Sequence, residues 1–269
     1  MAFCPLDYRY GCQDFKRIWS EVGRHERQLE VERALIWAHM QLGRVSEEDY
    51  NAVAAIANPE SVTKERVSEI EAETRHDIMA LTKAMAEAAG DAGWCIHLGA
   101  TSNDIVDTAV ALQLRDSIVL LREQLCLLIG VCADVAERER DTVMLGRTHG
   151  QAASPSTFGK EINIFLSRLD NEIKTLKSVQ VKGKWGGATG NFHTLVLIDE
   201  KKNWINFIKG FFKFIKTPLN TITTQIEPHD CIAELSHSIV RINNVLIDMN
   251  RDIWMYISND LFKLKVIKG

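Results

Sequence analysis

The spacing of apolar residues along the chain is helical almost from end to end. Between Asp14 and Leu42, apolar side chains recur every three or four residues, and Gly43 ends the run. Alternation with period two, which is typical of strands, occurs only in the stretches 194–198 and 220–226. We therefore predict an all-α fold. The further helices that the apolar spacing predicts cover residues 46–57, 63–89, 104–138, 160–179, 202–215 and a final stretch from about 228.

The predicted helix over residues 104–138 is the longest of the set. Residues 101–104 read TSND and supply capping side chains and negative charge before its apolar run. A helix of this length spans about 50 Å at 1.5 Å per residue. It needs packing partners along its whole length, which favours a helix bundle. We predict an N-terminal helical domain over residues 1–103 and a central long-helix bundle domain over residues 104–269.

Composition and charge exclude several classes of protein. The net charge of −4 provides no basic surface for nucleic acid, so we expect no nucleic-acid partner. The most apolar stretch, residues 118–135, contains Arg122, Glu123 and Asp134, so we expect no membrane span. The six cysteines form no CxxC pair and no metal-like cluster with histidine. Cys126, Cys132 and Cys95 lie among apolar residues, which predicts buried free thiols and a reducing compartment, most simply the cytoplasm.

Alanine usage changes along the chain. Alanine is frequent up to Ala153, but beyond Lys160 only Ala188 and Ala233 remain. One explanation is a change in the surroundings of the helices, and the other is that the two parts have different ancestry. The composition alone leaves both open.

The segment GRTHGQ at residues 146–151 places a histidine at a break between two predicted helices. His149 lies between Gly146 and Gly150, and glycines allow the backbone to approach a ligand closely. Histidine transfers protons readily near neutral pH. We predict a catalytic histidine here, and the alternative is an exposed loop histidine.

The segment ETRHDIMA at residues 73–80 places three polar side chains in a row, at a candidate helix start. Arg75 suits a phosphate or carboxylate as a bidentate donor. Asp77 is suited to orient an imidazole or a ligand hydroxyl, and His76 lies between the two. The alternative is a solvated run of charges.

Two hydroxyls, Thr101 and Ser102, stand at the start of the longest predicted helix. Free backbone N–H groups and the helix dipole make such a start an anion site, although ordinary capping explains the same residues. Arg9 and Tyr10 precede the first helix, where the alternative is an N-terminal arm that packs on the body of the protein.

Near the start of the last predicted helix, the segment TTQIEPHD at residues 223–230 offers Gln225, and the alternative is again a helix cap. No HExxH, P-loop or GxGxxG motif occurs, so the sequence supports neither a metal site nor a dinucleotide site. The basic, aromatic stretch 201–216 has the period of an amphipathic helix. Packing in the bundle explains it better than contact with a membrane or nucleic acid.

The motifs TRHD, LGATSNDIVDTA, GRTHGQ and TTQIEPHD occur in this order on a helical chain. In this respect the chain resembles the fumarase/aspartase superfamily and, within it, the adenylosuccinate lyases. The resemblance implies a long-helix bundle fold and a cytoplasmic homotetramer with shared active sites. It implies elimination of fumarate from adenylosuccinate, giving AMP, and from the succinyl-aminoimidazole-carboxamide ribotide of purine biosynthesis, without a cofactor. The alternatives are another fumarate-releasing lyase, such as argininosuccinate lyase, and a non-catalytic helical assembly subunit.

The resemblance also implies roles for single residues. His149 is similar to the general acid of the family, and His76 to a histidine that acts beside it. The residues implied to bind substrate are Arg9 and Tyr10 on the phosphate side, Arg75 and Asp77 at the nucleotide, Thr101 and Ser102 at the fumaryl carboxylate, and Gln225.

In one respect the chain departs from the family pattern. The family carries a signature loop, GSSxMPxKxNP, whose serine is the general base, followed by a third helical domain. The chain stops at LFKLKVIKG, where this loop is expected to begin. We therefore expect a truncated chain that lacks the C-terminal domain and is nearly inactive alone.

Overall fold

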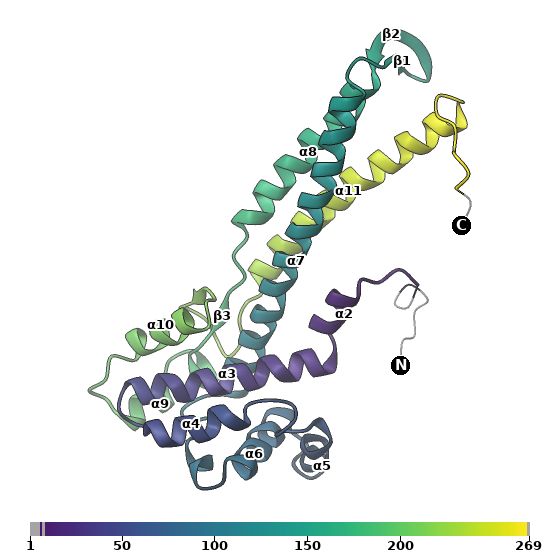
Figure 1. Ribbon diagram of the computed structural model, residues 1–269. Coiled ribbons are helices and arrows are strands. Elements are labelled where there is room, and N and C mark those ends of the chain that lie inside the picture. The colour runs from purple at the N-terminus through teal and green to yellow at the C-terminus, as the bar shows by residue number, and fades with distance from the viewer. Residues whose placement is uncertain (1–5, 7–8, 268–269) are drawn as a thin grey trace. The chain divides into compact units, whose positions relative to one another are not determined.

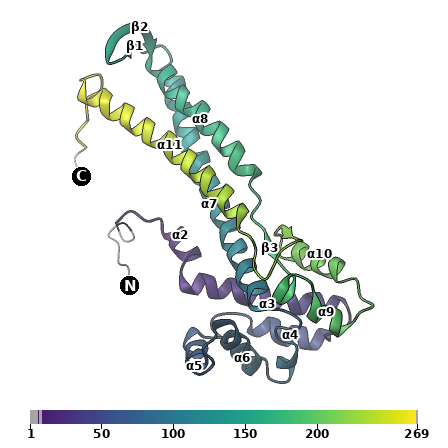
Figure 2. The same ribbon diagram turned by 180° about the vertical axis from the view of Figure 1, so that it is seen from behind.

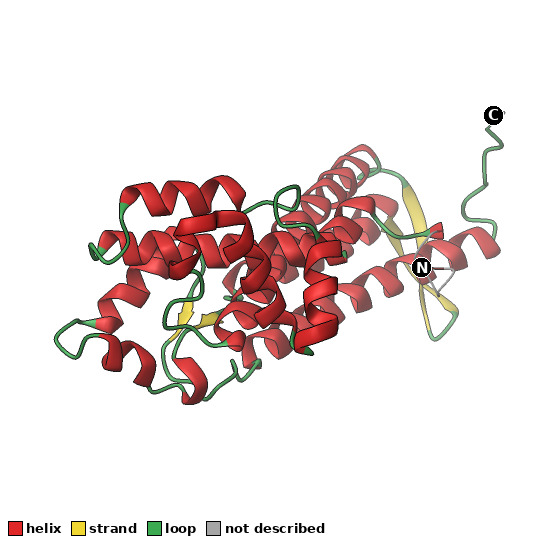
Figure 3. Ribbon diagram, turned by 90° about the horizontal axis from the view of Figure 1, so that it is seen from below, coloured by secondary structure: helices red, strands yellow, loops and turns green. Residues whose placement is uncertain are grey.

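The computed structural model describes residue 6 and residues 9–267, and helices dominate it (Figures 1 and 3). The all-α prediction is therefore confirmed. In the described residues, no helix has the length and apolar character needed to cross a membrane. The α-helices are α2 (Gln13–Ile18), α3 (Glu21–Gln41), α4 (Glu47–Ile56), α5 (Lys64–Thr74), α6 (Asp77–Ala89), α7 (Ser102–Arg138), α8 (Phe158–Ser178), α9 (His193–Ile198), α10 (Trp204–Phe214) and α11 (Asp230–Ser258).

The chain divides into two compact units. Unit 1 comprises Met1–Ile118 and Gln180–His229, and unit 2 comprises Val119–Val179 and Asp230–Gly269. The long helix α7 contributes its first half to unit 1 and its second half to unit 2. The domain boundary predicted between residues 103 and 104 stays a prediction.

The core of unit 1 is formed mainly by α3, α4, α6 and α10. Leu35 and Ile36 of α3 are completely buried in it. The rings of Trp37 and Phe214 stack with centroids 4.1 Å apart and join α3 to α10. This packing forms the base on which the loop before α7 lies.

Side-chain caps set the starts of several helices in unit 1. The hydroxyls of Ser20, Ser46 and Thr63 accept hydrogen bonds from backbone N–H groups in the first turns of α3, α4 and α5. Such caps satisfy donors that the helix itself leaves free. Ser20 therefore separates α2 from α3, so the single helix predicted from residue 14 to residue 42 is two helices.

The predicted helix over residues 63–89 is also two helices, because Arg75 interrupts it. Its φ of 53° is left-handed, a conformation that ends α5, and His76 then opens α6 in an extended conformation. A non-glycine residue with this φ is uncommon and cannot continue a right-handed helix.

Unit 2 contains α8 and α11, which pack side by side (Figures 1 and 2). Their buried faces carry the apolar residues that the helical period predicts, among them Phe165 and Leu169 on α8 and Leu235 and Ile242 on α11. An ion pair between Arg168 and Asp248, 2.9 Å long, spans the two helices at the surface.

The segment between α7 and α8 is a β-hairpin, whereas we expected a loop. Strand β1 (Val143–Thr148) pairs antiparallel with β2 (Gln151–Thr157). His149 and Gly150 connect them with φ values of 53° and 71°. Positive φ at both central residues defines the tight turn whose twist matches two antiparallel strands.

The two stretches with period-two alternation do not form the strands that this pattern favours. Residues 194–198 lie in the short helix α9. Of the stretch 220–226, only its first residue belongs to a strand, β4 (Leu219–Asn220), which pairs parallel with β3 (Gly183–Lys184). The 3-10 turns η1 (Gly90–Cys95) and η2 (Gly187–Thr189) complete the regular structure of unit 1.

Candidate active site

Arg75, His76 and Asp77 form the junction between α5 and α6, and all three are exposed. The left-handed backbone of Arg75 turns the chain, and His76 Nδ1 accepts a hydrogen bond of 3.2 Å from the backbone N–H of Met79. His76 therefore caps α6. The junction presents a guanidinium, an imidazole and a carboxylate to solvent within three residues.

The junction lies against the start of α7. His76 Nε2 is 3.3 Å from Ser102 Oγ. Because Nδ1 accepts the capping bond, it carries no hydrogen in the neutral ring, and the ring hydrogen is on Nε2. His76 then donates to the Ser102 hydroxyl. The structure thus brings together two of the motifs that the sequence separates by 26 residues.

The side chain of Asp104, in the first turn of α7, caps the start of the helix. The backbone N–H of Thr101 donates to Asp104 Oδ2 over 2.9 Å, and the N–H of Asp104 donates to the Thr101 carbonyl over 2.9 Å. Thr101 and Ser102 remain half-buried, with their hydroxyls at the positive end of the helix dipole. This arrangement suits a carboxylate or phosphate ligand.

Beneath this helix start lies an ion pair that sequence reasoning missed. Lys184 Nζ is 2.7 Å from Asp104 Oδ1, and both side chains are completely buried. The carboxylate of Asp104 also accepts from the backbone N–H groups of Gly186 and Gly187, over 3.0 and 3.2 Å. The signal for it in the sequence is the glycine-rich stretch that follows Lys184.

Gln225 is brought to the same region by its backbone. Its carbonyl accepts a 2.6 Å hydrogen bond from Lys184 Nζ, while its side chain is exposed. Two residues later, the backbone N–H of Glu227 donates to Asp107 Oδ2 over 2.7 Å. The segment that carries Gln225 therefore lies against the first two turns of α7.

Two histidines outside the predicted site support the loop that leads into α7. His97 Nδ1 is 2.6 Å from Oε1 of the fully buried Glu32. Burial lowers the pKa of His97, but the charge and hydrogen bond of Glu32 outweigh burial and raise it overall. His39 Nε2 lies 2.9 Å from the Leu98 carbonyl, and burial lowers its pKa to about 4. His39 is thus a neutral donor.

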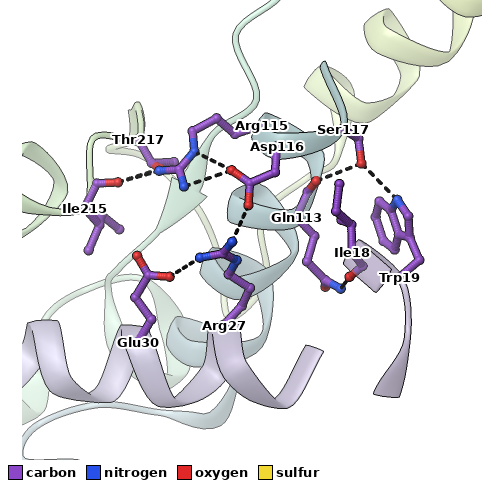
Figure 4. Close-up of polar contacts among 10 residues, drawn as sticks. All are labelled: Ile18, Trp19, Arg27, Glu30, Gln113, Arg115, Asp116, Ser117, Ile215 and Thr217. Carbon is purple, nitrogen blue, oxygen red and sulfur yellow. Dashed lines mark hydrogen bonds and ion pairs between the residues drawn. The ribbon is translucent and has the colours of Figure 1, made fainter. Parts of the chain in front are cut away.

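Arg9 and Tyr10 precede α2, and both are exposed. In the described part of the chain, no hydrogen bond or ion pair connects either residue to the other predicted site residues. The helix that follows them is anchored on α7, as Figure 4 shows. Gln113 Nε2 donates to the Ile18 carbonyl over 2.6 Å, and Trp19 Nε1 donates to Ser117 Oγ over 2.9 Å.

Further ion pairs strengthen this anchor. Arg27 Nη2 of α3 is 2.6 Å from Asp116 Oδ2 on α7. Arg115 holds the other oxygen of Asp116 and donates over 2.7 Å to the Ile215 carbonyl (Figure 4). The helix α2, which follows Arg9, is therefore held on α7. Helix α7 is in turn held by α3 and by the segment at Ile215.

His149 belongs to unit 2, whereas His76, Ser102 and Gln225 belong to unit 1. It occupies the exposed turn of the hairpin, where Arg147 Nη1 donates to the Gly150 carbonyl over 3.3 Å. The tight turn presents the imidazole free of packing.

A cavity of about 730 Å³ lies within unit 2, between the hairpin and the ends of α8 and α11. On its wall, Glu161 accepts from Ser156 Oγ over 2.9 Å and from the Tyr256 hydroxyl over 3.3 Å. Burial raises the pKa of Tyr256 to about 12, so the phenol is neutral. Among the described residues, no cluster of histidine, cysteine and carboxylate side chains is arranged to hold a metal ion.

The geometry defines a helical protein whose longest helix starts beside a buried ion pair. A sequence family described as Lyase matches residues 12–269, and the chain belongs to this family. A solved structure also resembles this chain in fold. The crystal structure of a fumarate lyase from Mesorhizobium sp. BNC1 superposes with a TM-score of 0.84 at 27% identity, covering 93% of this chain and 58% of that one.

Curated relatives support a finer comparison. The chain is 38% identical to an adenylosuccinate lyase of Pyrococcus abyssi over 94% of its length, and 48% identical to that of Archaeoglobus fulgidus over 87%. It is 34% identical to the Escherichia coli adenylosuccinate lyase over its whole length. The chain spans 56%, 51% and 62% of these three relatives, respectively.

Proposed function

We propose that the protein acts as an adenylosuccinate lyase, a carbon–nitrogen lyase of purine nucleotide biosynthesis. It eliminates fumarate from adenylosuccinate, which leaves AMP, and from the succinyl-aminoimidazole-carboxamide ribotide. The observation that carries this proposal is the 48% identity to the Archaeoglobus fulgidus adenylosuccinate lyase, which extends over 87% of the chain. The reaction is a β-elimination that needs no metal or organic cofactor.

The helix start of α7 suits the fumaryl end of such a substrate. Thr101 and Ser102 offer hydroxyls at the positive end of the helix dipole, and His76 donates to Ser102. A carboxylate placed there is stabilised as negative charge develops on the adjacent carbon during elimination. Gln225 adds an amide from the segment held against the same helix.

The remaining predicted residues serve the nucleotide and the leaving group. Arg75 and Asp77 are assigned to the nucleotide, and Arg9 and Tyr10 to its phosphate. His149 is assigned as the general acid that protonates the departing nitrogen, since an exposed imidazole can exchange protons with solvent between turnovers. Proton transfer of this kind contributes about 10²–10⁴-fold to a rate.

We propose that the protein forms a homotetramer with shared active sites. Exposed apolar side chains support it, because contiguous apolar surface marks sites of association. We propose that the assembly acts in the cytoplasm. The exposed apolar side chains on the helices of unit 2 include Val119, Leu127, Val131, Ile164, Val240, Ile247 and Trp254.

The test uses the purified product of the complete gene with adenylosuccinate, argininosuccinate and malate as separate substrates. We expect AMP and fumarate from the first and no product from the other two. Replacement His149→Gln is expected to lower kcat by about 10²–10⁴-fold. The control is His237→Gln, a change of another exposed histidine in unit 2, which should leave kcat unchanged.

The same experiment separates the alternatives. Cleavage of argininosuccinate alone would identify another fumarate-releasing lyase. A stable tetramer without turnover of any of the three compounds would favour the non-catalytic assembly subunit and contradict the proposed function.

A further inference from the structure

The ion pair between Lys184 and Asp104 is unusual among the ion pairs of the described residues, because both of its side chains are completely buried. Buried charges lose the hydration that stabilises them in water, and well-packed apolar residues often stabilise a protein as well or better. The presence of a buried pair at this position therefore calls for an explanation other than stability.

Every hydrogen-bonding group of the pair is used. The three N–H donors of Lys184 have three acceptors, which are Asp104 Oδ1 at 2.7 Å, the Gln225 carbonyl at 2.6 Å and the Gly187 carbonyl at 3.3 Å. The carboxylate of Asp104 in turn accepts from the backbone N–H groups of Thr101, Gly186 and Gly187. A pair that is fully satisfied in this way fixes the position of each of its partners.

The partners belong to three segments that are distant in sequence. They are the start of α7 at Thr101, the glycine-rich turn at Gly186 and Gly187, and the segment of Gln225. Two of these segments carry residues assigned to the substrate. Apart from the ion pair itself, the bonds involve backbone atoms, so the side chains of Thr101 and Gln225 stay free for a ligand.

We propose that Lys184 and Asp104 are positioning residues, which hold the start of α7 and the Gln225 segment at the separation that binds the fumaryl half of the substrate. Being buried, neither side chain touches the ligand. The inference rests on the proposed function for the identity of the ligand, but not for the geometry that the pair maintains.

The glycine-rich turn explains why the pair is built at this place. A Cβ atom on Gly190 would lie within van der Waals overlap of the Thr223 carbonyl oxygen, so the turn packs backbone against backbone. Lys184 reaches across this junction to Gln225. The ammonium group of Lys184 therefore joins the two segments at a place where their backbones pack directly against each other.

The experiment compares Lys184→Met with Lys182→Met in the product of the complete gene. Lys182 lies two residues earlier and is exposed, so the control makes the same change of charge without touching the pair. A charge-free variant, Lys184→Met with Asp104→Leu, leaves no unpaired charge. The affinities for fumarate and for AMP are measured separately by calorimetry, together with kcat, KM and the melting temperature.

We expect the affinity of the folded Lys184 variants for fumarate to fall at least tenfold, and kcat to fall about a hundredfold, as small misplacements of reacting groups do. The affinity for AMP should stay within about twofold of the unaltered protein, because this pair does not hold the nucleotide residues. Unchanged fumarate affinity would overturn the proposal. An equal loss of both affinities would overturn it as well, since it indicates general destabilisation.

A milder variant covers the case in which the charge variants do not fold. Thr108→Val removes one buried hydrogen bond of 3.1 Å to the Lys184 carbonyl and keeps the ion pair. We expect a smaller loss of fumarate affinity with AMP affinity retained, and wild-type affinity for fumarate would overturn the proposal.

Hydrogen exchange separates this proposal from the proposed function. If the unaltered protein neither cleaves adenylosuccinate nor binds fumarate, the proposed function fails. The amides of Thr101 and Gly187 should still exchange faster in Thr108→Val and Lys184→Met than in Lys182→Met. Equal exchange rates would show that the pair does not position these segments.

Discussion

The two halves of α7 differ in the polar side chains that they bury and the apolar side chains that they expose. In the first half, which belongs to unit 1, Asp104, Asp107 and Gln113 are buried. In the second half, which belongs to unit 2, Leu127 and Val131 are exposed, by 67% and 59%. One continuous helix thus buries polar groups at one end and exposes apolar groups at the other.

The difference shows what each half is built to contact. Every buried polar residue of the first half has a partner from another segment, such as the Ile18 carbonyl for Gln113 and the Glu227 N–H for Asp107. Burial of polar groups is tolerated only with such partners. The second half of α7 instead exposes Leu127 and Val131. The first half therefore packs against other segments of unit 1 through its polar side chains as well as its apolar ones.

The largest expected effect concerns His39, which contacts the loop that leads into the first half of α7. Burial lowers the pKa of His39 to about 4 from its ordinary 6.5, so the unfolded chain binds a proton between these pH values and the folded chain does not. As pH falls from 6.5 to 4, His39 should cost up to about 3 kcal/mol of unfolding free energy. Replacement His39→Gln keeps a donor for the Leu98 carbonyl and should remove this loss.

The measurement is the difference in unfolding free energy between His39→Gln and the unaltered chain, from urea titrations at several pH values. The difference cancels the opposite contribution of His97, whose raised pKa stabilises the fold at low pH and loses that effect as pH rises through it. A difference that does not change between pH 6.5 and 4 would contradict the assignment of His39 as a buried neutral donor.

A second prediction compares the two halves of α7 directly by the same substitution. Asp107→Ala removes the acceptor of the buried Glu227 N–H and should lower the unfolding free energy by about 1–3 kcal/mol. Leu127→Ala removes a largely exposed side chain and should change it by no more than about 0.5 kcal/mol. Denaturant unfolding at a concentration where light scattering finds monomers measures both. The reverse order of effects would break the comparison.

The smallest effect concerns the contact of the α5–α6 junction with the start of α7. His76→Ala removes the cap of α6 and should cost about 1 kcal/mol. His76→Asn provides a good capping side chain that is too short to reach Ser102, so it should retain the stability of the unaltered chain. Thermal unfolding of the two variants measures this. Equal destabilisation by both would show that the contact with Ser102, and not the cap, stabilises the junction.

Most helices could be predicted from the sequence because each buries one face and so imposes its period on the residues. The period over residues 160–179 matches α8 within two residues at its start and one at its end. The start of α7 was predicted from capping residues for the same local reason. Features that depend on neighbours in sequence were therefore accessible.

Features that depend on distant segments were not accessible. No glycine or proline marks the helix break at Arg75, whose backbone is left-handed. The hairpin strands around His149 are mostly exposed and lack the apolar alternation of a half-buried strand. Lys184 is a residue type that is almost never fully buried unless paired, and its partner Asp104 lies far away in the chain. The architecture of the candidate site depends on long-range pairs such as Lys184 and Asp104.

The separation of Lys184 from Asp104 also affects the order in which the chain can mature during synthesis. Lys184 follows Asp104 by about 80 residues, and the whole hairpin and α8 lie between them. At about 5–20 residues per second, the ribosome needs roughly 4–16 s to produce this stretch. During that interval the carboxylate of Asp104 has no ammonium partner and stays hydrated. The start of α7 therefore acquires its final form only after the intervening part of unit 2 has emerged.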